Sequence, residues 1–213
     1  MNNWVDLTNP QHFCAYLKMM AGWATIDEIR AGPARTLTLR PPGTNGNHYA
    51  RYRPVPLGRL AGHEYFLIEN RQRLGRDAQI PGAGVLVWHI DEQGNNYNES
   101  LLPNALHANY EVTLVQADNR WELQRNVNAG DTTDPFYAGN ASAGYVNRFS
   151  DTTQPGASWW DGTRSGLELR DFSVRGSEMT VVAEVKPPRI LRDPLSQTAN
   201  VGSDLLLSVQ MAD

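Results

Sequence analysis

Short apolar segments separated by clusters of turn-forming residues run through this chain and restrict it to a β-rich fold. Seven segments of four to seven residues are rich in β-branched and aromatic side chains, and glycine, proline and asparagine lie between them. Such segments predict strands, and a series of them predicts a mainly β fold, an antiparallel β-sandwich-like module. The predicted strands are residues 36–39, 49–55, 64–69, 85–91, 110–116, 167–172 and 179–185.

One short α-helix is predicted ahead of the strands. Asn9 can cap it, Pro10 suits its first turn, and Gly22 suits its C-terminal stop. Between these signals, apolar side chains recur at helical spacing and predict a stripe that faces the core. The stripe consists of Phe13, Leu17 and Met20, with Tyr16 beside them.

Length, charge and cysteine content exclude several classes of protein. The 213 residues suffice for one large or two small domains with a real core. A net charge of -4 and a pI near 5.7 provide no electrostatic basis for binding nucleic acid or an anionic membrane. No apolar run approaches the roughly 20 residues that span a bilayer. The single cysteine, Cys14, excludes an intramolecular disulfide and a zinc–thiolate cluster.

Paired prolines within residues 186–190 mark the best domain boundary, because they end one unit and stiffen a linker. We therefore expect a helical segment over residues 1–23, a β-rich module over 24–185, and a linker with the start of an immunoglobulin-like domain over 186–213. That last unit contains a lone strand pattern at residues 201–210, which cannot bury both its faces. The chain is thus expected to be part of a longer polypeptide.

His63 and Glu64 form half of a zinc-protease motif. In the complete motif, His-Glu-x-x-His on a helix, two imidazoles one turn apart bind one zinc ion and the glutamate acts as general base. Here the fourth residue after His63 is Leu67, and the segment after Glu64 has the pattern of a buried strand. None of the five histidines has another four residues away. A zinc site of this kind is therefore not expected within the chain.

Several segments occur in the order typical of a known family. They are residues 16–23, 64–71, 81–91, 116–118, 130–136, 161–167 and 176–180. Over residues 10–185, the chain resembles the part of the immune inhibitor A family of secreted zinc metallopeptidases that follows the zinc-binding helix. The resemblance implies a parent enzyme that hydrolyses peptide bonds with zinc, whose ligands lie upstream of this chain.

The resemblance also implies a role for this portion of the parent. It is expected to be a non-catalytic part that supports the upstream protease domain and its cleft for a peptide or protein substrate. The portion alone is expected to be inactive. The family is exported, so the resemblance implies secretion, with a signal peptide upstream of the present chain.

Acidic residues gather in the predicted turns and suggest a calcium site. Asp131 and Asp134 lie in a glycine-containing loop, and hard oxygen ligands on a flexible loop suit Ca²⁺. We predict one structural calcium ion near these two residues. The alternative is that each aspartate caps a turn by bonding to its own backbone, which applies equally to Asp118, Asp151 and Asp161. The sequence contains no complete EF-hand pattern.

Two further pairs of residues carry open alternatives. Trp159 and Trp160 can form an exposed aromatic platform, which predicts, as an alternative function, a module of an exported protein that binds carbohydrate or protein. Packing in the core is the other interpretation of this pair. His89 and Asp91 share one face of a predicted strand. They can bind a common ligand, or His89 can be a buried histidine with a hydrogen-bond partner, which is the commoner outcome.

Overall fold

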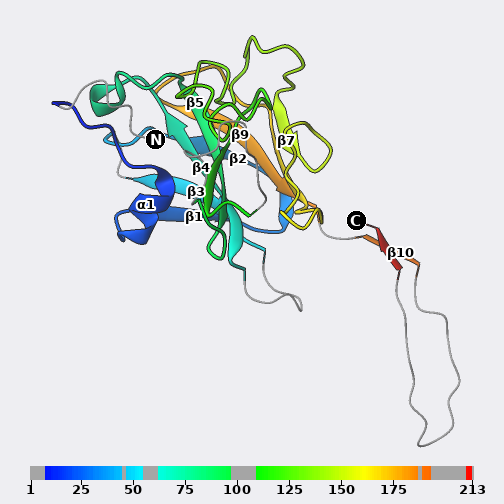
Figure 1. Ribbon diagram of the computed structural model, residues 1–213. Coiled ribbons are helices and arrows are strands. Elements are labelled where there is room, and N and C mark those ends of the chain that lie inside the picture. The colour runs from blue at the N-terminus through cyan, green and yellow to red at the C-terminus, as the bar shows by residue number, and fades with distance from the viewer. Residues whose placement is uncertain are drawn as a thin grey trace, which may run out of the picture.

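The computed structural model describes residues 8–44, 47–54, 62–96, 109–186, 189–192 and 210–212. This part of the chain forms two larger sheets that pack face to face, and a separate two-stranded sheet (Figure 1). Strand order is β1-β3-β4-β5-β6 in the first sheet and β2-β9-β8-β7 in the second. The elements are α1 (Ala15–Met20), β1 (Thr25–Ile29), β2 (Gly32–Leu39), β3 (His48–Tyr52), β4 (Glu64–Arg71), η1 (Gly75–Asp77), β5 (Gly84–Asp91), β6 (Val112–Val115), β7 (Arg148–Ser150), β8 (Leu167–Arg170), β9 (Met179–Val185), β10 (Arg189–Arg192) and β11 (Gln210–Ala212).

The mainly β prediction is confirmed, and each of the seven predicted segments contains a strand. Residue 55, at the end of one predicted segment, lies outside the described residues. Two strands of the sandwich, β1 and β7, were not predicted. Within the two larger sheets, every pairing is antiparallel except that of β1 with β3, which is parallel.

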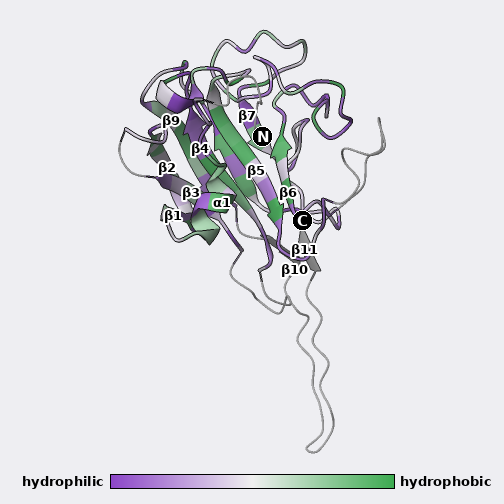
Figure 2. Ribbon diagram, turned by 60° about the vertical axis from the view of Figure 1, so that its left-hand side comes forward, coloured by the Kyte–Doolittle hydropathy of each residue, from purple (hydrophilic) through white to green (hydrophobic). Residues whose placement is uncertain are grey.

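The central strand β4 is buried on both faces, which explains its continuous apolar sequence. Phe66 and Ile68 point into the core between the two larger sheets. Tyr65 and Leu67 point to the opposite face, where α1 packs in a second apolar cluster. The neighbouring strand β5 is likewise largely hydrophobic (Figure 2). Two apolar layers therefore hold the first sheet in place, one on each of its faces.

The helix is shorter than predicted at its start and ends as predicted. The Asn9 side chain donates to the carbonyl of Gly75 at 3.3 Å, so the proposed cap is wrong. Gly22 adopts a φ of +71°, and its N–H donates to the Met19 carbonyl at 3.0 Å. The Trp23 N–H donates to the Lys18 carbonyl at 2.9 Å, which completes a Schellman motif.

The predicted core-facing stripe of α1 is wrong, because its side chains point to solvent. Phe13, Leu17 and Met20 are exposed by 50, 49 and 61% respectively. The buried face carries Ala15, Tyr16 and, unexpectedly, Lys18, whose amine donates to Asn47 Oδ1 at 2.9 Å. The helix therefore buries the Lys18 side chain, and the apolar side chains at helical spacing are exposed to solvent.

The C-terminal predictions fall largely on residues outside the described ranges. In residues 189–192 and 210–212, β10 and β11 pair antiparallel. Residues 193–209 are not described, so the immunoglobulin-like start and the division into three units stay predictions. In the ranges that the structure covers, no helix combines the length and apolar character needed to cross a membrane.

Candidate metal centre

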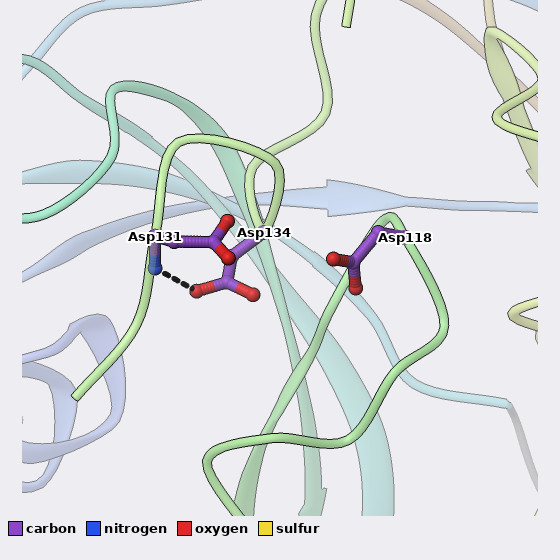
Figure 3. Close-up of side chains that lie close together, drawn as sticks. All are labelled: Asp118, Asp131 and Asp134. Carbon is purple, nitrogen blue, oxygen red and sulfur yellow. Dashed lines mark hydrogen bonds between the residues drawn. The ribbon is translucent and has the colours of Figure 1, made fainter. Parts of the chain in front are cut away.

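Two loops at one edge of the sandwich bring three aspartates together. Asp118 lies in the turn after β6, and Asp131 and Asp134 lie in the loop before β7. One carboxylate oxygen from each of the three lies within 4.8 Å of the others (Figure 3). The structure thus places the two aspartates singled out from the sequence side by side and adds Asp118 to them.

The loop that carries Asp131 and Asp134 is pinned to the first sheet by backbone hydrogen bonds. Val85 and Phe136 exchange two such bonds, of 3.0 and 2.8 Å, and the Ala117 N–H donates to the Asp134 carbonyl at 2.8 Å. Gly82 lets the loop approach closely, because a Cβ there would lie 2.3 Å from the Asp131 carbonyl oxygen. The carboxylates are therefore held on a rigid frame.

Local hydrogen bonds fix the orientation of each carboxylate. Asp131 Oδ1 accepts from the Thr133 N–H at 2.7 Å and lies 2.6 Å from the Thr133 hydroxyl. The same hydroxyl lies 2.8 Å from Asp118 Oδ2, so it bridges two carboxylates. The Asp131 N–H donates to Asp134 Oδ2 at 2.7 Å.

Asp134 differs from the other two because one of its oxygens has no partner. The residue is only 4% exposed, and its Oδ1 is buried without a hydrogen bond. In Figure 3, this second oxygen lies on the side of Asp118, away from the bond to the Asp131 N–H. A buried carboxylate oxygen without a partner costs free energy, and native proteins rarely leave one so. Asp134 Oδ1 is therefore the atom of this group that would gain most from an added partner.

The pKa values of Asp131 and Asp134 are shifted in opposite directions. Burial raises the pKa of Asp134 to about 7, and the negative charges of Asp131 and Asp118 act in the same direction. Burial also acts to raise the pKa of Asp131, but the hydrogen bonds from Thr133 outweigh it, and the net shift of that pKa is downward. Among the described residues, the ion pair recorded for this group comes from Arg120, 3.6 Å from Asp118 Oδ2 and 54% exposed.

The ligand set suits a hard cation. All three side chains offer oxygen, which Ca²⁺ and Mg²⁺ prefer, whereas structural zinc sites favour nitrogen and sulfur. Two oxygens on opposite sides of one calcium ion, each about 2.4 Å away, are separated by about 4.8 Å. The three oxygens lie within 4.8 Å of one another, so any two of them are close enough to contact one ion. Within the described residues, no second group of three such side chains is found.

The other two aspartates of the predicted turns accept hydrogen bonds from backbone N–H groups. Asp151 accepts from the N–H groups of Ser165 and Gly166, both at 2.9 Å. Asp161 accepts from the N–H and hydroxyl of Thr163 at 2.9 and 2.6 Å. Asp161 therefore caps its own turn, whereas Asp151 bonds to backbone 14 and 15 residues further on. The capping alternative also holds for Asp118 and Asp131, whose Oδ1 atoms accept from the N–H groups of Arg120 at 3.1 Å and Thr133 at 2.7 Å.

His63, from the incomplete zinc-protease motif, and His89 each lie within hydrogen-bonding distance of a carboxylate. His63 Nδ1 lies 2.7 Å from Asp91 Oδ1, and His89 Nε2 lies 2.8 Å from Glu64 Oε1. Glu64 lies on β4, as the strand pattern predicted, so the helical arrangement of a zinc motif does not form. His89 is buried and bonded, which confirms the commoner of its two outcomes.

The paired tryptophans do not form one exposed platform. Trp159 is 5% exposed and stacks on Phe66 in the core, with ring centroids 5.1 Å apart. Trp160 is half-buried and lies parallel to the His89 ring at 4.7 Å. Because Trp159 is buried, the platform prediction is wrong for that residue.

Sequence reasoning left Asp118 among the turn-capping aspartates. The available signal was its position in the segment 116–118, one of those that carry the family resemblance. No family model matches the chain, and no curated protein or solved structure matches it either. The geometry of the site is accordingly the main evidence on function.

Proposed function

We propose that this chain is a non-catalytic, cation-binding β-sandwich module of a secreted zinc metallopeptidase that resembles immune inhibitor A. The observation that carries the proposal is the buried, partnerless Oδ1 of Asp134, on the side that faces Asp118. Calcium is the proposed cation, because the ligands are carboxylates on loops and their spacing suits Ca–O distances. The ion fastens two loops and stabilises the module.

The parentage is supported by where the family-like segments lie. Segments 81–91, 116–118 and 130–136 are far apart in the sequence, yet they meet at the metal centre through the bonds of Val85 and Ala117. The close approach of Gly82 to the Asp131 carbonyl adds a further contact between them. Three of the segments that carry the resemblance therefore contribute to one site.

Support for a docking role comes from the exposed side of α1. Phe13, Leu17 and Met20, together with Trp23 at 61% exposure, form a ridge of large apolar side chains. Exposed apolar patches on soluble proteins mark sites of association. In the proposed parent, this ridge packs against the upstream protease domain, which holds the zinc and cleaves the peptide or protein substrate.

Calorimetric titration of the purified chain with CaCl₂, after treatment with a chelator, tests the cation site. We expect one binding event per chain and a higher melting temperature with calcium. Asp134→Asn should abolish both effects, because it removes the charge of the buried oxygen pair. Asp161→Asn is the matched control, since this aspartate caps a turn outside the centre. Absence of heat and of any chelator effect on the melting of the wild type would refute the site.

A casein assay tests the non-catalytic part of the proposal. The isolated chain, supplied with zinc, should leave casein intact. Cleavage that a zinc chelator abolishes would show that the chain holds its own catalytic centre.

A further inference from the structure

A lysine amine, a side-chain amide and an imidazole come together at α1. Lys18 lies on the buried face of the helix, and its amine nitrogen Nζ donates to Asn47 Oδ1 at 2.9 Å. His12 Nδ1 lies 3.3 Å from the same amine. Asn47 directly precedes β3, so the fold brings the amine to an amide 29 residues further along the chain.

The surroundings of Lys18 favour a neutral amine. The residue is 3% exposed, and the buried carboxylates of Glu69 and Asp77 pair with Arg71 and not with Lys18. Burial lowers the pKa of Lys18, and the positive charge of Arg71 acts in the same direction. The two carboxylates act to raise that pKa, but the net shift is downward.

The hydrogen bonds of Lys18 also fit a neutral amine. An ammonium group has three N–H donors, whereas a neutral amine has two and a lone pair in place of the third. The described residues provide two acceptors, the Asn47 amide oxygen and His12 Nδ1. Burial and the charge of Lys18 lower the pKa of His12, which favours the neutral ring. The lone pair of Nζ is therefore available as a nucleophile.

The amide carbon of Asn47 lies within reach of that lone pair. A carbonyl bond is about 1.23 Å long, so Nζ is at most about 4.1 Å from Asn47 Cγ. A near-attack geometry requires roughly 3–3.5 Å, so a movement of Nζ by about 1 Å completes the approach.

The neighbours of the amide suit its two atoms in an acyl transfer. The Tyr49 hydroxyl donates to Asn47 Oδ1 at 3.5 Å, a long bond that would shorten as negative charge develops on the oxygen. Burial raises the pKa of Tyr49, so this donor keeps its proton. The amide nitrogen Nδ2 donates to the Trp23 carbonyl at 3.0 Å in an exposed bond, so a leaving group at this atom reaches solvent.

We propose that Lys18 and Asn47 form an intramolecular isopeptide bond that ties α1 to β3. Nζ attacks Cγ, the Nζ–Cγ bond forms and the Cγ–Nδ2 bond breaks. Nζ gives one proton to His12 Nδ1, which releases it to solvent, and Nδ2 takes one from solvent and leaves as ammonia. The step is neither an oxidation nor a reduction, and it needs no co-reactant. It does not depend on the cation site.

The experiment measures the state of Lys18 in the purified full chain by mass spectrometry. The chain contains two lysines, Lys18 and Lys186, so acetylation in urea reports the free amine of each. We expect Lys186 to be acetylated, Lys18 to be protected, and the intact mass to be lower by one ammonia. Trypsin should release residues 1–30 joined to residues 36–51, because a linked Lys18 resists cleavage. An acetylated Lys18 and separate peptides in the wild type would overturn the proposal.

The joined peptides are the decisive product. Ring closure at Asn45, which precedes a glycine, also expels ammonia, but it joins no peptides and leaves Lys18 free. Lys18→Arg keeps a donor for Asn47 and should abolish the link, whereas Lys186→Arg, at a side chain that is 60% exposed, should retain it. A joined product in Lys18→Arg would place the bond elsewhere and overturn the assignment.

A time course tests the role of His12. Chain dissolved in urea from inclusion bodies should be unlinked, and refolding by dilution should start the reaction. His12→Ala should slow the appearance of the joined peptides by about 100-fold or more, as loss of a general base does. An equal rate in this variant would overturn the role of His12 as base, and linkage in urea would overturn the requirement for the fold.

Discussion

Two groups of charged residues line opposite ends of one small cavity, and they differ in how their buried charges are compensated. Beside α1, Arg71 is 5% exposed and lies 3.3 Å from Glu69 and 3.4 Å from Asp77. At the other end of the cavity, Asp131 and Asp134 have no buried cation beside them among the described residues. The first group balances its charges within the chain, and the second leaves a carboxylate oxygen without a partner.

The difference between these groups separates structure from ligand binding. Every charge beside α1 meets an opposite charge or a hydrogen bond, and Arg71 also donates to the carbonyls of His12 and Phe13 at 2.9 and 2.7 Å. That cluster ties the N-terminal segment to β4 and needs nothing from outside. The aspartate group has no buried counter-charge among the described residues, so an external cation would stabilise this group most.

The largest expected effect is the loss of the balanced cluster. Arg71→Met leaves Glu69 and Asp77 buried without their main counter-charge, so we expect about 3–5 kcal/mol less stability in urea unfolding. Arg35→Met is the control, because its pair with Asp27 is exposed and worth about 0–1 kcal/mol. A similar loss in both variants would show that the buried cluster is not special. Arg71→Met should retain full stabilisation by calcium, which separates the two groups.

The pH dependence of stability comes next and distinguishes the unbalanced group. The pKa of Asp134 is raised from 3.8 to about 7, so the folded chain binds a proton that the unfolded chain has lost. In EDTA, this contribution is complete below about pH 4 and disappears as the pH rises through 7, a loss of at most about 4 kcal/mol. Asp134→Asn should remove that slope in unfolding curves between pH 4 and pH 8. If Asp134→Asn keeps the wild-type slope, another group causes the pH dependence of stability.

Calcium should reverse part of this loss at neutral pH. Free calcium at a hundred times its dissociation constant stabilises the folded chain by about 2.7 kcal/mol if it binds only that state. The gain should shrink below pH 7, because the proton on Asp134 then competes with the ion. Chemical unfolding with and without calcium at pH 6 and pH 7.5 measures this. An equal gain in stability at both pH values would show that Asp134 does not bind the ion.

The smallest expected effect concerns the hydroxyl that bridges two carboxylates. Thr133→Val removes the donor between Asp118 and Asp131, and we expect about 1–2 kcal/mol less stability without calcium. Thr163→Val is a close match, because Thr163 makes the same bonds to the single exposed Asp161. That control should lose no more than about 0.5 kcal/mol. Equal losses would mean that the second carboxylate adds nothing.

Strands with a strong local pattern were predictable, and the two missed strands show the limit. β1 carries Asp27 and Glu28 at its centre, residues that are depleted in strands. Its identity as a strand depends on pairing with β3, 23 residues further on, as Thr25 with His48. β7 has three residues, too few for any alternation to register. Pairing with distant neighbours, and not local propensity, makes both of them strands.

The orientation of the helix and the makeup of the candidate metal centre were likewise not predictable from local sequence. Helical spacing located the apolar ridge of α1 correctly, but the buried cluster around Arg71 set which face of the helix turned inward. Loop composition singled out Asp131 and Asp134, whereas Asp118 had only its place in the family-like segment 116–118 to connect it to them. It joins them because the end of β6 lies beside the loop, through the bond from the Ala117 N–H to the Asp134 carbonyl.

The sequence by itself determined where most strands lie, where the helix ends and that no His-Glu-x-x-His motif is present. These features depend on residues within a few positions of each other, where alternation, turn chemistry and glycine conformation act. Only the tertiary structure decided which carboxylates meet and which face of α1 is buried. Those features depend on burial and charge compensation between distant segments, and such compensation is settled only when the two sheets and their loops pack together.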